Sequence, residues 1–132
     1  MDSVSDDRGQ ALLVAVLALA IAATAVVGLR AAQDRIVVAA RTQRAGEAAV
    51  EAAAQAVADL YGAHAVAPAE LVVDPRTLEA ARIAAEELAR LNGASGVEQM
   101  QLVCARGRIE ARLVLNAYSH HAGFSAPECF LF

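Results

Sequence analysis

The side chains best suited to chemistry lie near the C-terminal end of the sequence: Cys104, Cys129 and the run Ser119-His120-His121. Two cysteines are enough for one disulfide bond, but their spacing does not distinguish a bond from two free buried thiols. The cysteines and the two histidines also supply the atom types of a zinc site. Because adjacent histidines rarely ligate one metal together and the sequence has no CxxC motif, we expect no metal site.

A hydrolase is the enzyme class that Ser119-His120-His121 would suggest. No nucleophile elbow or oxyanion motif accompanies these residues, and no glycine-rich phosphate loop is present. A solvated turn explains Arg106-Gly107-Arg108 better than an anion site does. We therefore expect no enzymatic activity, no cofactor and no small-molecule substrate.

The composition indicates a small core. Of 132 residues, 58% are hydrophobic but only 4% are aromatic, with no Trp. A core poor in aromatic residues buries little area per residue, so we expect a membrane or a partner protein to supply part of the stability. The formal net charge of -4 and the scattered basic residues argue against a nucleic-acid partner.

An uncharged apolar segment covers residues 11–29. At about 1.5 Å per residue it spans roughly 28 Å, which matches the hydrocarbon core of a bilayer at about 30 Å. We expect a transmembrane helix over 10–29 and a membrane-lipid environment. A buried helix of a soluble protein is disfavoured because Thr24 is the only polar side chain. A cleaved secretory signal is disfavoured because the helical pattern continues past Arg30.

The same helix is predicted to continue through residues 30–61. From Gln10 to Tyr61 there is no proline, and only two glycines interrupt the helix formers. Mostly small and apolar residues repeat at alternating spacings of four and three, as in the seam of a packed helix. The pattern leaves open whether this seam packs on the chain's own domain, on neighbouring subunits, or on both. The seam comprises Ala32, Ile36, Ala39, Gly46, Val50, Ala53, Val57 and Leu60.

Residues 62–132 are predicted to form a small domain, which gives an α+β fold class. Asp74 and Pro75 are typical of a helix start, and Asn92-Gly93 is typical of a helix end, so a second helix is expected over 75–92. Alternating apolar residues predict an antiparallel β-hairpin or small sheet packed on the helices.

The hairpin consists of strands over 97–105 and 108–117, joined by a turn at Arg106-Gly107. A loop is predicted from Gly62 to Val73. The tail from Tyr118 to Phe132 is predicted to be irregular, with its apolar end docked on the domain.

Three stretches of the chain, in this order, resemble TadE/TadG-like pseudopilins. The start, Arg8-Gly9-Gln10-Ala11-Leu12-Leu13 before a small-residue apolar helix, is similar to the start of that family. The Ala-rich stretch 44–54 resembles its post-membrane segment. The segment 84–94, followed by a strand that bears Cys104, is similar to its short actinobacterial-type members. The family supplies minor components of bacterial tight-adherence (Tad/Flp) pili and related secretion systems.

This resemblance implies a processing site, a topology and partners. A prepilin peptidase would cut the Gly9–Gln10 bond, so residues 1–9 would be a cytoplasmic leader. The C-terminal domain would lie outside the inner membrane of a bacterium, and other pilin-like subunits would be its partners, with incorporation into a pilus as a further expectation. In an extracytoplasmic domain the first interpretation of Cys104 and Cys129 is a disulfide bond.

Two features depart from this pattern. Classical pilins carry Glu five residues after the cut, where Val14 stands here. A subunit without that charge is expected to be a minor component rather than the repeating unit. Arginines also follow the apolar segment, and the positive-inside rule alone would place the domain in the cytoplasm. The alternative function is therefore a single-pass membrane-anchored binding or regulatory subunit unrelated to pili. The arginines are Arg30, Arg35, Arg41 and Arg44.

Overall fold

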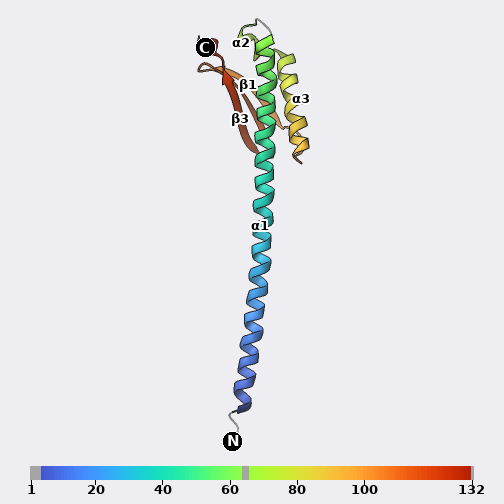
Figure 1. Cartoon of the computed structure of the whole chain (residues 1–132), viewed down its shortest axis with the longest axis vertical. Helices are drawn as coiled ribbons and strands as arrows, with labels where there is room; N and C mark the ends of the chain where they lie inside the picture. The colour runs from blue at the N-terminus through green and yellow to red at the C-terminus, as the bar shows by residue number, and fades with distance from the viewer. Residues whose placement is uncertain (1–3, 64–65, 132) are drawn as a thin grey trace. The chain divides into compact units, whose positions relative to one another are not determined.

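The computed structural model describes residues 4–63 and 66–131 and has the predicted α+β class. The chain divides into two compact units, one ending at Val38 and the other beginning at Ala39. Figure 1 shows the elements in chain order. These are α1 (Val4–Ala63), α2 (Pro68–Leu71), α3 (Pro75–Leu91), β1 (Gln99–Ala105), β2 (Arg108–Leu115), β3 (Tyr118–Ser125) and the 3-10 helix η1 (Pro127–Leu131).

Helix α1 covers the predicted 10–61 and extends beyond both ends of that range. Its 60 residues contain no proline and are rich in Ala and Leu, which have the highest helix propensities. Of the predicted leader, 1–9, the first three residues lie outside the described residues, and the backbone from Val4 onward is helical.

Helix α3 begins and ends with the predicted signals. The Asp74 side chain accepts a hydrogen bond from the backbone N–H of Arg76 at 2.9 Å, and Pro75 occupies the first turn. At the other end Gly93 has a φ of 79°, and the Ala94 N–H donates to the carbonyl of Ala89 at 2.9 Å. This is the glycine-terminated helix end that satisfies the last free carbonyls.

The prediction of an irregular tail is wrong, because Tyr118–Ser125 forms a third antiparallel strand. The sheet order is β1-β2-β3. Two-residue turns with positive φ join the strands: Arg106 and Gly107 between β1 and β2, and Asn116 and Ala117 between β2 and β3. Turns of this kind match the right-handed twist of paired strands.

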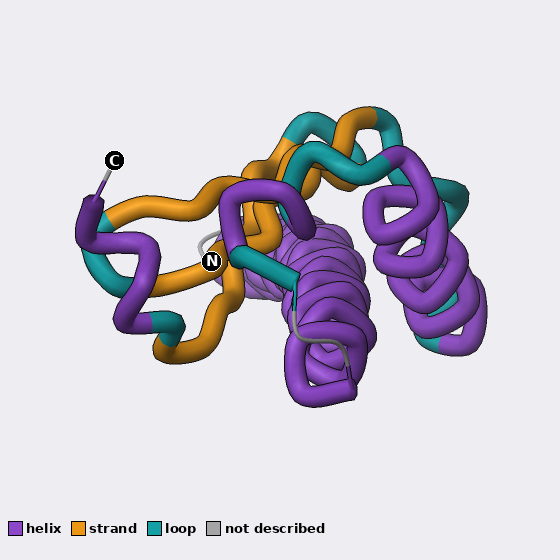
Figure 2. The backbone as a smooth tube through the Cα atoms, turned by 90° about the horizontal axis from the view of Figure 1, so that it is seen from above, coloured by secondary structure: helices purple, strands orange, loops and turns teal. Residues whose placement is uncertain are grey.

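The core of the second unit lies between the sheet and the helices. Figure 2 shows the C-terminal part of α1 between α3 and the strands. One face of β2 is almost fully buried, through Ile109, Ala111, Leu113 and Leu115. Facing helix positions are mostly alanine, so the helix backbones can approach closely; these alanines are Ala45, Ala49, Ala53, Ala54, Ala81, Ala85 and Ala89. The predicted loop 62–73 holds the short helix α2, whose Pro68 and Leu71 are buried.

Gly46 of α1 makes room for a buried histidine. A Cβ atom at Gly46 would overlap the imidazole ring of His120, which is only 6% exposed. His120 lies on the core face of β3, opposite Leu113 of β2. Gly46 is therefore required for this close helix–sheet contact, although glycine in a helix interior costs about 1 kcal/mol relative to alanine.

We predict that Gly46→Ala destabilises the protein even though it raises helix propensity. Overlap with the ring should cost about 1–3 kcal/mol, which exceeds the propensity gain of about 1 kcal/mol. The matched control is Gly62→Ala in the last turn of α1, where an added Cβ meets no atom within 4 Å. Thermal unfolding of the full chain in detergent, followed by circular dichroism, compares the two. An unfolding midpoint that rises in both variants would contradict the assigned contact.

Candidate functional site

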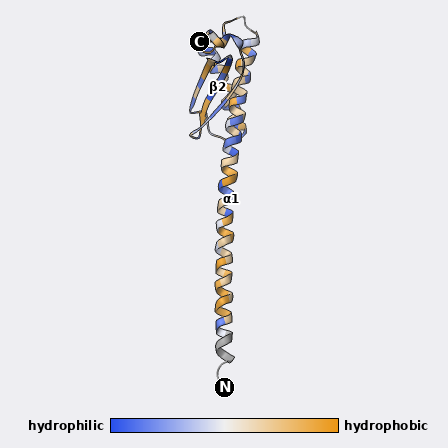
Figure 3. Cartoon of the chain, turned by 90° about the vertical axis from the view of Figure 1, so that its left-hand side faces the viewer, coloured by the Kyte–Doolittle hydropathy of each residue, from blue (hydrophilic) through white to orange (hydrophobic). Residues whose placement is uncertain are grey.

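The first candidate site is the apolar segment of the first unit, which is exposed along its length. Leu12, Leu17 and Ile21 are 69%, 57% and 60% exposed. Over the described residues, α1 is the helix that is long and apolar enough to cross a membrane, and none of its most apolar window is buried within the chain. In Figure 3 this part of the α1 ribbon is coloured mostly as hydrophobic. A core helix of a soluble protein would be mostly buried.

The composition of residues 11–29 suits lipid contact. Ten of these residues are Leu, Ile or Val, so insertion at the bilayer centre is favourable by a few kcal/mol. The one hydroxyl in the segment is satisfied within the helix, since Thr24 Oγ1 donates to the carbonyls of Ala20 and Ile21 at 3.0 and 2.8 Å. The segment therefore presents no free side-chain donor to hydrocarbon.

The predicted seam divides into two halves with different environments. From Gly46 onward it faces the core: Val50 is 3% exposed, and Ala53 and Val57 are fully buried. Leu60, at the end of the seam, is partly buried against the same core. The earlier members Ala32, Ile36 and Ala39 are exposed, with Ile36 at 68%. The second half therefore packs on the chain's own domain, and the first half is available to other molecules.

A disulfide bond joins Cys104 of β1 to Cys129 of η1, with a Cα–Cα distance of 5.2 Å. Cys129 is fully buried. Because the two sulfur atoms are bonded to each other, they cannot act as zinc ligands. Across the described ranges, no cluster of three or more His, Cys, Asp or Glu side chains could hold a metal ion.

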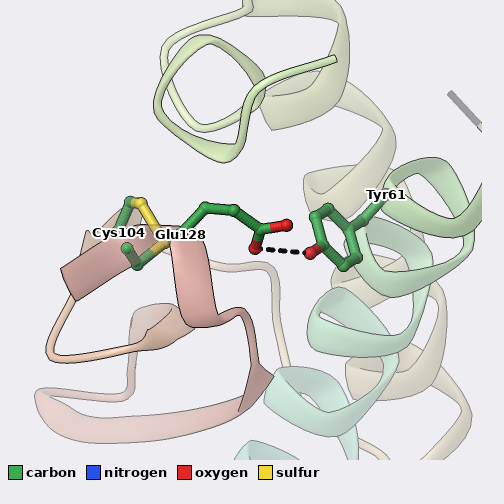
Figure 4. The surroundings of a disulfide bond; sticks show 4 residues. Tyr61, Cys104 and Glu128 are labelled. Atoms are coloured by element: carbon green, nitrogen blue, oxygen red, sulfur yellow. Dashed lines mark hydrogen bonds between the residues drawn. A yellow bond between two sulfur atoms is a disulfide. The ribbon is translucent and has the colours of Figure 1, made fainter. Parts of the chain in front are cut away.

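Further contacts hold η1 in place. The Tyr61 hydroxyl at the end of α1 donates to a carboxylate oxygen of Glu128 at 2.8 Å (Figure 4). The Ala126 N–H donates to the carbonyl of Gly107 at 2.9 Å. The ring of Phe130 lies where a Cβ on Gly107 would be. η1 is thus linked to α1, to β1 and to the first hairpin turn.

The two histidines point to opposite faces of β3 and cannot act as a pair. His120 is buried against Gly46, and its Nε2 has no hydrogen-bond partner within the part of the chain that is described. His121 is exposed on the outer face, opposite Arg112 of β2. Ser119 also lies on the outer face, so alternation along the strand separates it from His120.

The outer face of the sheet has a shallow hollow of about 710 Å³. Gln101, Arg112 and His121 form one row across its three strands. Arg112 forms an ion pair with Glu110 at 2.9 Å, and this hydrogen bond lowers the pKa of Glu110. Sequence reasoning missed this row because it assigned no strand to the tail. Its amide, guanidinium and imidazole groups are typical of a solvated sheet face.

We predict that losing the disulfide destabilises the second unit by about 3 kcal/mol, because the bond closes a loop across 25 residues of sequence. Cys104→Ser/Cys129→Ser should unfold at lower urea concentration than the parent and should not respond to reductant. The parent should shift toward the variant when reductant is added. Labelling of both cysteines by a thiol reagent in unfolded, unreduced protein would contradict the bond.

We predict that the hydrogen bond between Tyr61 and Glu128 makes a pH-dependent contribution to the free energy of unfolding. The backbone N–H of Glu128 and then the Tyr61 hydroxyl lower the pKa of Glu128, while the bond to Glu128 raises the pKa of Tyr61. The ionised Glu128 carboxylate stabilises the folded state fully at pH values above its pKa in the unfolded chain, about 4.3. This stabilisation is lost as the pH falls through the lower pKa of Glu128 in the folded protein. The protonated Tyr61 phenol stabilises the folded state fully at pH values below its pKa in the unfolded chain, about 10. This stabilisation is lost as the pH rises through the higher pKa of Tyr61 in the folded protein.

Tyr61→Phe should therefore lower the unfolding temperature near pH 7, and the difference from the parent should shrink at both extremes. Glu128→Gln, which removes the titrating carboxylate, is the control for the acid limb. A Tyr61→Phe difference that stays constant from pH 3 to pH 7 would show that the bond does not form in solution.

Comparison of the chain with protein-family models, with curated proteins and with solved structures finds no match. Function must therefore be inferred from the residues themselves. Three features carry that inference. They are an exposed apolar helix of membrane-spanning length, the exposed first half of the seam beyond it (Ala32, Ile36 and Ala39, here called the half-seam), and a small disulfide-linked domain.

Proposed function

We propose that this protein is a minor pseudopilin, a membrane-anchored structural subunit for assembly of a Tad/Flp-type pilus or a related secretion complex. The observation that carries the proposal is helix α1 itself. Its N-terminal part is an exposed apolar helix, and its C-terminal part supplies one side of the core of a small α+β domain. A membrane anchor that continues as the spine of its own domain suits a subunit that passes from bilayer to assembly.

The residues at the start of α1 support the same proposal. Arg8-Gly9-Gln10 stands directly before the apolar segment, as at the processing sites of TadE/TadG-like pseudopilins. Gly9 and Gln10 are exposed, and an added Cβ at Gly9 would meet no atom within 4 Å. A prepilin peptidase could therefore reach the bond, although it would have to unwind the first turns of the helix to bind it in extended form.

Val14 favours a minor role over that of a repeating subunit. It is 65% exposed, at the position where classical pilins carry the Glu that pairs with a neighbour's N-terminal amine. In an apolar fibre core, an amine without its carboxylate partner is costly. A subunit present once or a few times per assembly incurs that cost only at its own position.

The disulfide and the exposed half-seam support an extracytoplasmic, assembling domain. Disulfides persist outside the cytosol, so Cys104–Cys129 favours that side of the membrane. Ala32, Ile36 and Ala39 supply a small-residue surface on which a neighbouring helix could pack closely.

The alternative is a single-pass binding or regulatory subunit with no role in pili. Four arginines between residues 30 and 44 favour it, because basic residues after a span usually mark the cytoplasmic side. The two functions differ in topology, processing and neighbours.

The experiment that distinguishes the two functions measures both the topology of the chain and its processing. In bacterial cells stripped of their outer layers, protease should remove a tag placed after Phe132. Mass spectrometry should find a chain that begins at Gln10 only when the prepilin peptidase is active. Protection of the tag would support the regulatory alternative, and retention of residues 1–9 despite an active peptidase would end the processing proposal.

Assembly is tested by single cysteines placed on two sides of α1. Ile36→Cys lies on the exposed half-seam, and Val38→Cys lies two residues away on another side of the helix with a similar exposure of 62%. We predict that oxidation in cells cross-links Ile36→Cys, but not Val38→Cys, to a neighbouring subunit. Equal cross-linking at both positions, or none at either, would contradict assembly through the seam.

A further inference from the structure

The segment that follows the apolar helix carries two exposed arginines, Arg30 and Arg35. Both belong to the first unit. Arg30 comes directly after Leu29, the last apolar residue of the segment, and Arg35 lies six residues beyond Leu29. At about 1.5 Å of rise per residue, the two Cα positions lie roughly 1.5 and 9 Å beyond the end of the apolar segment.

Neither arginine forms an ion pair with a carboxylate within residues 4–63 and 66–131. The ion pairs found there are Arg82–Glu86 and Arg112–Glu110, which lie in the second unit. Asp34, four residues after Arg30, is placed to pair with it on the helix surface but does not do so. After Asp34, the next carboxylate in the chain is Glu47. The described part of the chain thus provides no carboxylate partner for either guanidinium group.

The polar layer of a bilayer extends about 5–8 Å beyond each side of the hydrocarbon core. With the apolar segment spanning that core, the guanidinium of Arg30 lies within this layer. The long Arg35 side chain can reach back into it, because arginine keeps its charged end at the level of polar groups while its stem covers apolar surface. Phosphate oxygens are the acceptors that a guanidinium binds best, through paired hydrogen bonds.

We propose that Arg30 and Arg35, which lie about 140° apart around the helix, each bind the headgroup phosphate of an anionic phospholipid in the leaflet on the domain's side. The inference rests on the proposed membrane span, but it holds for either orientation of the domain. Charge complementarity favours lipid over a second copy of this chain, because the matching segment of that copy, residues 30–46, carries one carboxylate, Asp34, and four arginines. With the domain outside the cytoplasm, anionic lipid would also balance the positive charge of a segment that the positive-inside rule disfavours on that side.

The test uses the full chain in nanodiscs made of equal parts of phosphatidylglycerol and phosphatidylcholine. Native mass spectrometry counts the lipids of each kind that stay bound after release. We expect phosphatidylglycerol to be enriched, and Arg30→Gln/Arg35→Gln to reduce the enrichment by up to about fivefold for each arginine removed. High salt should weaken the enrichment in the parent.

The matched control is Arg41→Gln/Arg44→Gln. It makes the same change in charge at two exposed arginines of the second unit, which follow Leu29 by 12 and 15 residues. This variant should keep the enrichment of the parent, because electrostatic attraction to the surface falls off within about 10 Å.

Three results would contradict the proposed binding of anionic lipid by Arg30 and Arg35. The first is undiminished enrichment in Arg30→Gln/Arg35→Gln, and the second is an equal loss in the control variant. The third is a parent protein that shows no lipid preference but forms dimers, which Arg30→Gln/Arg35→Gln loses. In that case the arginines would bind a second copy of the chain instead of lipid. Failure of the parent chain to float with vesicles at all would instead refute the membrane span, so the two proposals fail in distinguishable ways.

Discussion

Exposed hydrocarbon surface is the constraint on which this molecule depends. Over its described residues the first unit is helical, and its Leu, Ile and Val side chains from Leu12 to Val38 are about half exposed or more. In water that surface would be unfavourable by about 25 cal/mol for each Å². In a bilayer the same side chains favour insertion, and backbone hydrogen bonding is complete within the helix. The exposed side chains of the first unit are therefore suited to a membrane.

The second unit solves a different problem, which is stability with a small core. Its helices meet through alanines, which permit close approach but bury little area per residue. The larger buried side chains come from β2, chiefly Ile109, Leu113 and Leu115. Links that do not depend on buried area supplement this core: the disulfide to η1, and the Tyr61–Glu128 bond between η1 and α1. This is the usual solution of small domains whose apolar core is limited.

Local chemistry made the helices and the first hairpin predictable from sequence. Asp74-Pro75 and Asn92-Gly93 mark the ends of α3, and Arg106-Gly107 provides a glycine at a position with positive φ. The third strand escaped prediction because its turn is Asn116-Ala117, where alanine adopts a φ of 65° that its residue type does not suggest. With β3 missed, the separation of His120 from His121 and the polar row on the outer face were also out of reach. The seam could be recognised in the sequence as a repeating pattern. Which of its residues are buried and which are exposed depends on where the sheet packs along α1, and the seam pattern itself does not encode that position.

The glycine at residue 46 has a consequence for how the sheet is positioned along its helix. The imidazole of His120 fits over the backbone at this position because no side chain is there. The residues about one helical turn away on the same side of the helix, Thr42 and Val50, both carry a Cβ atom. A shift of the sheet by one turn along α1 is therefore disfavoured by contact with the His120 ring. Tension applied along the helix would meet a steric stop at this residue, so load can pass from helix to sheet through side-chain contact as well as through the connecting loops.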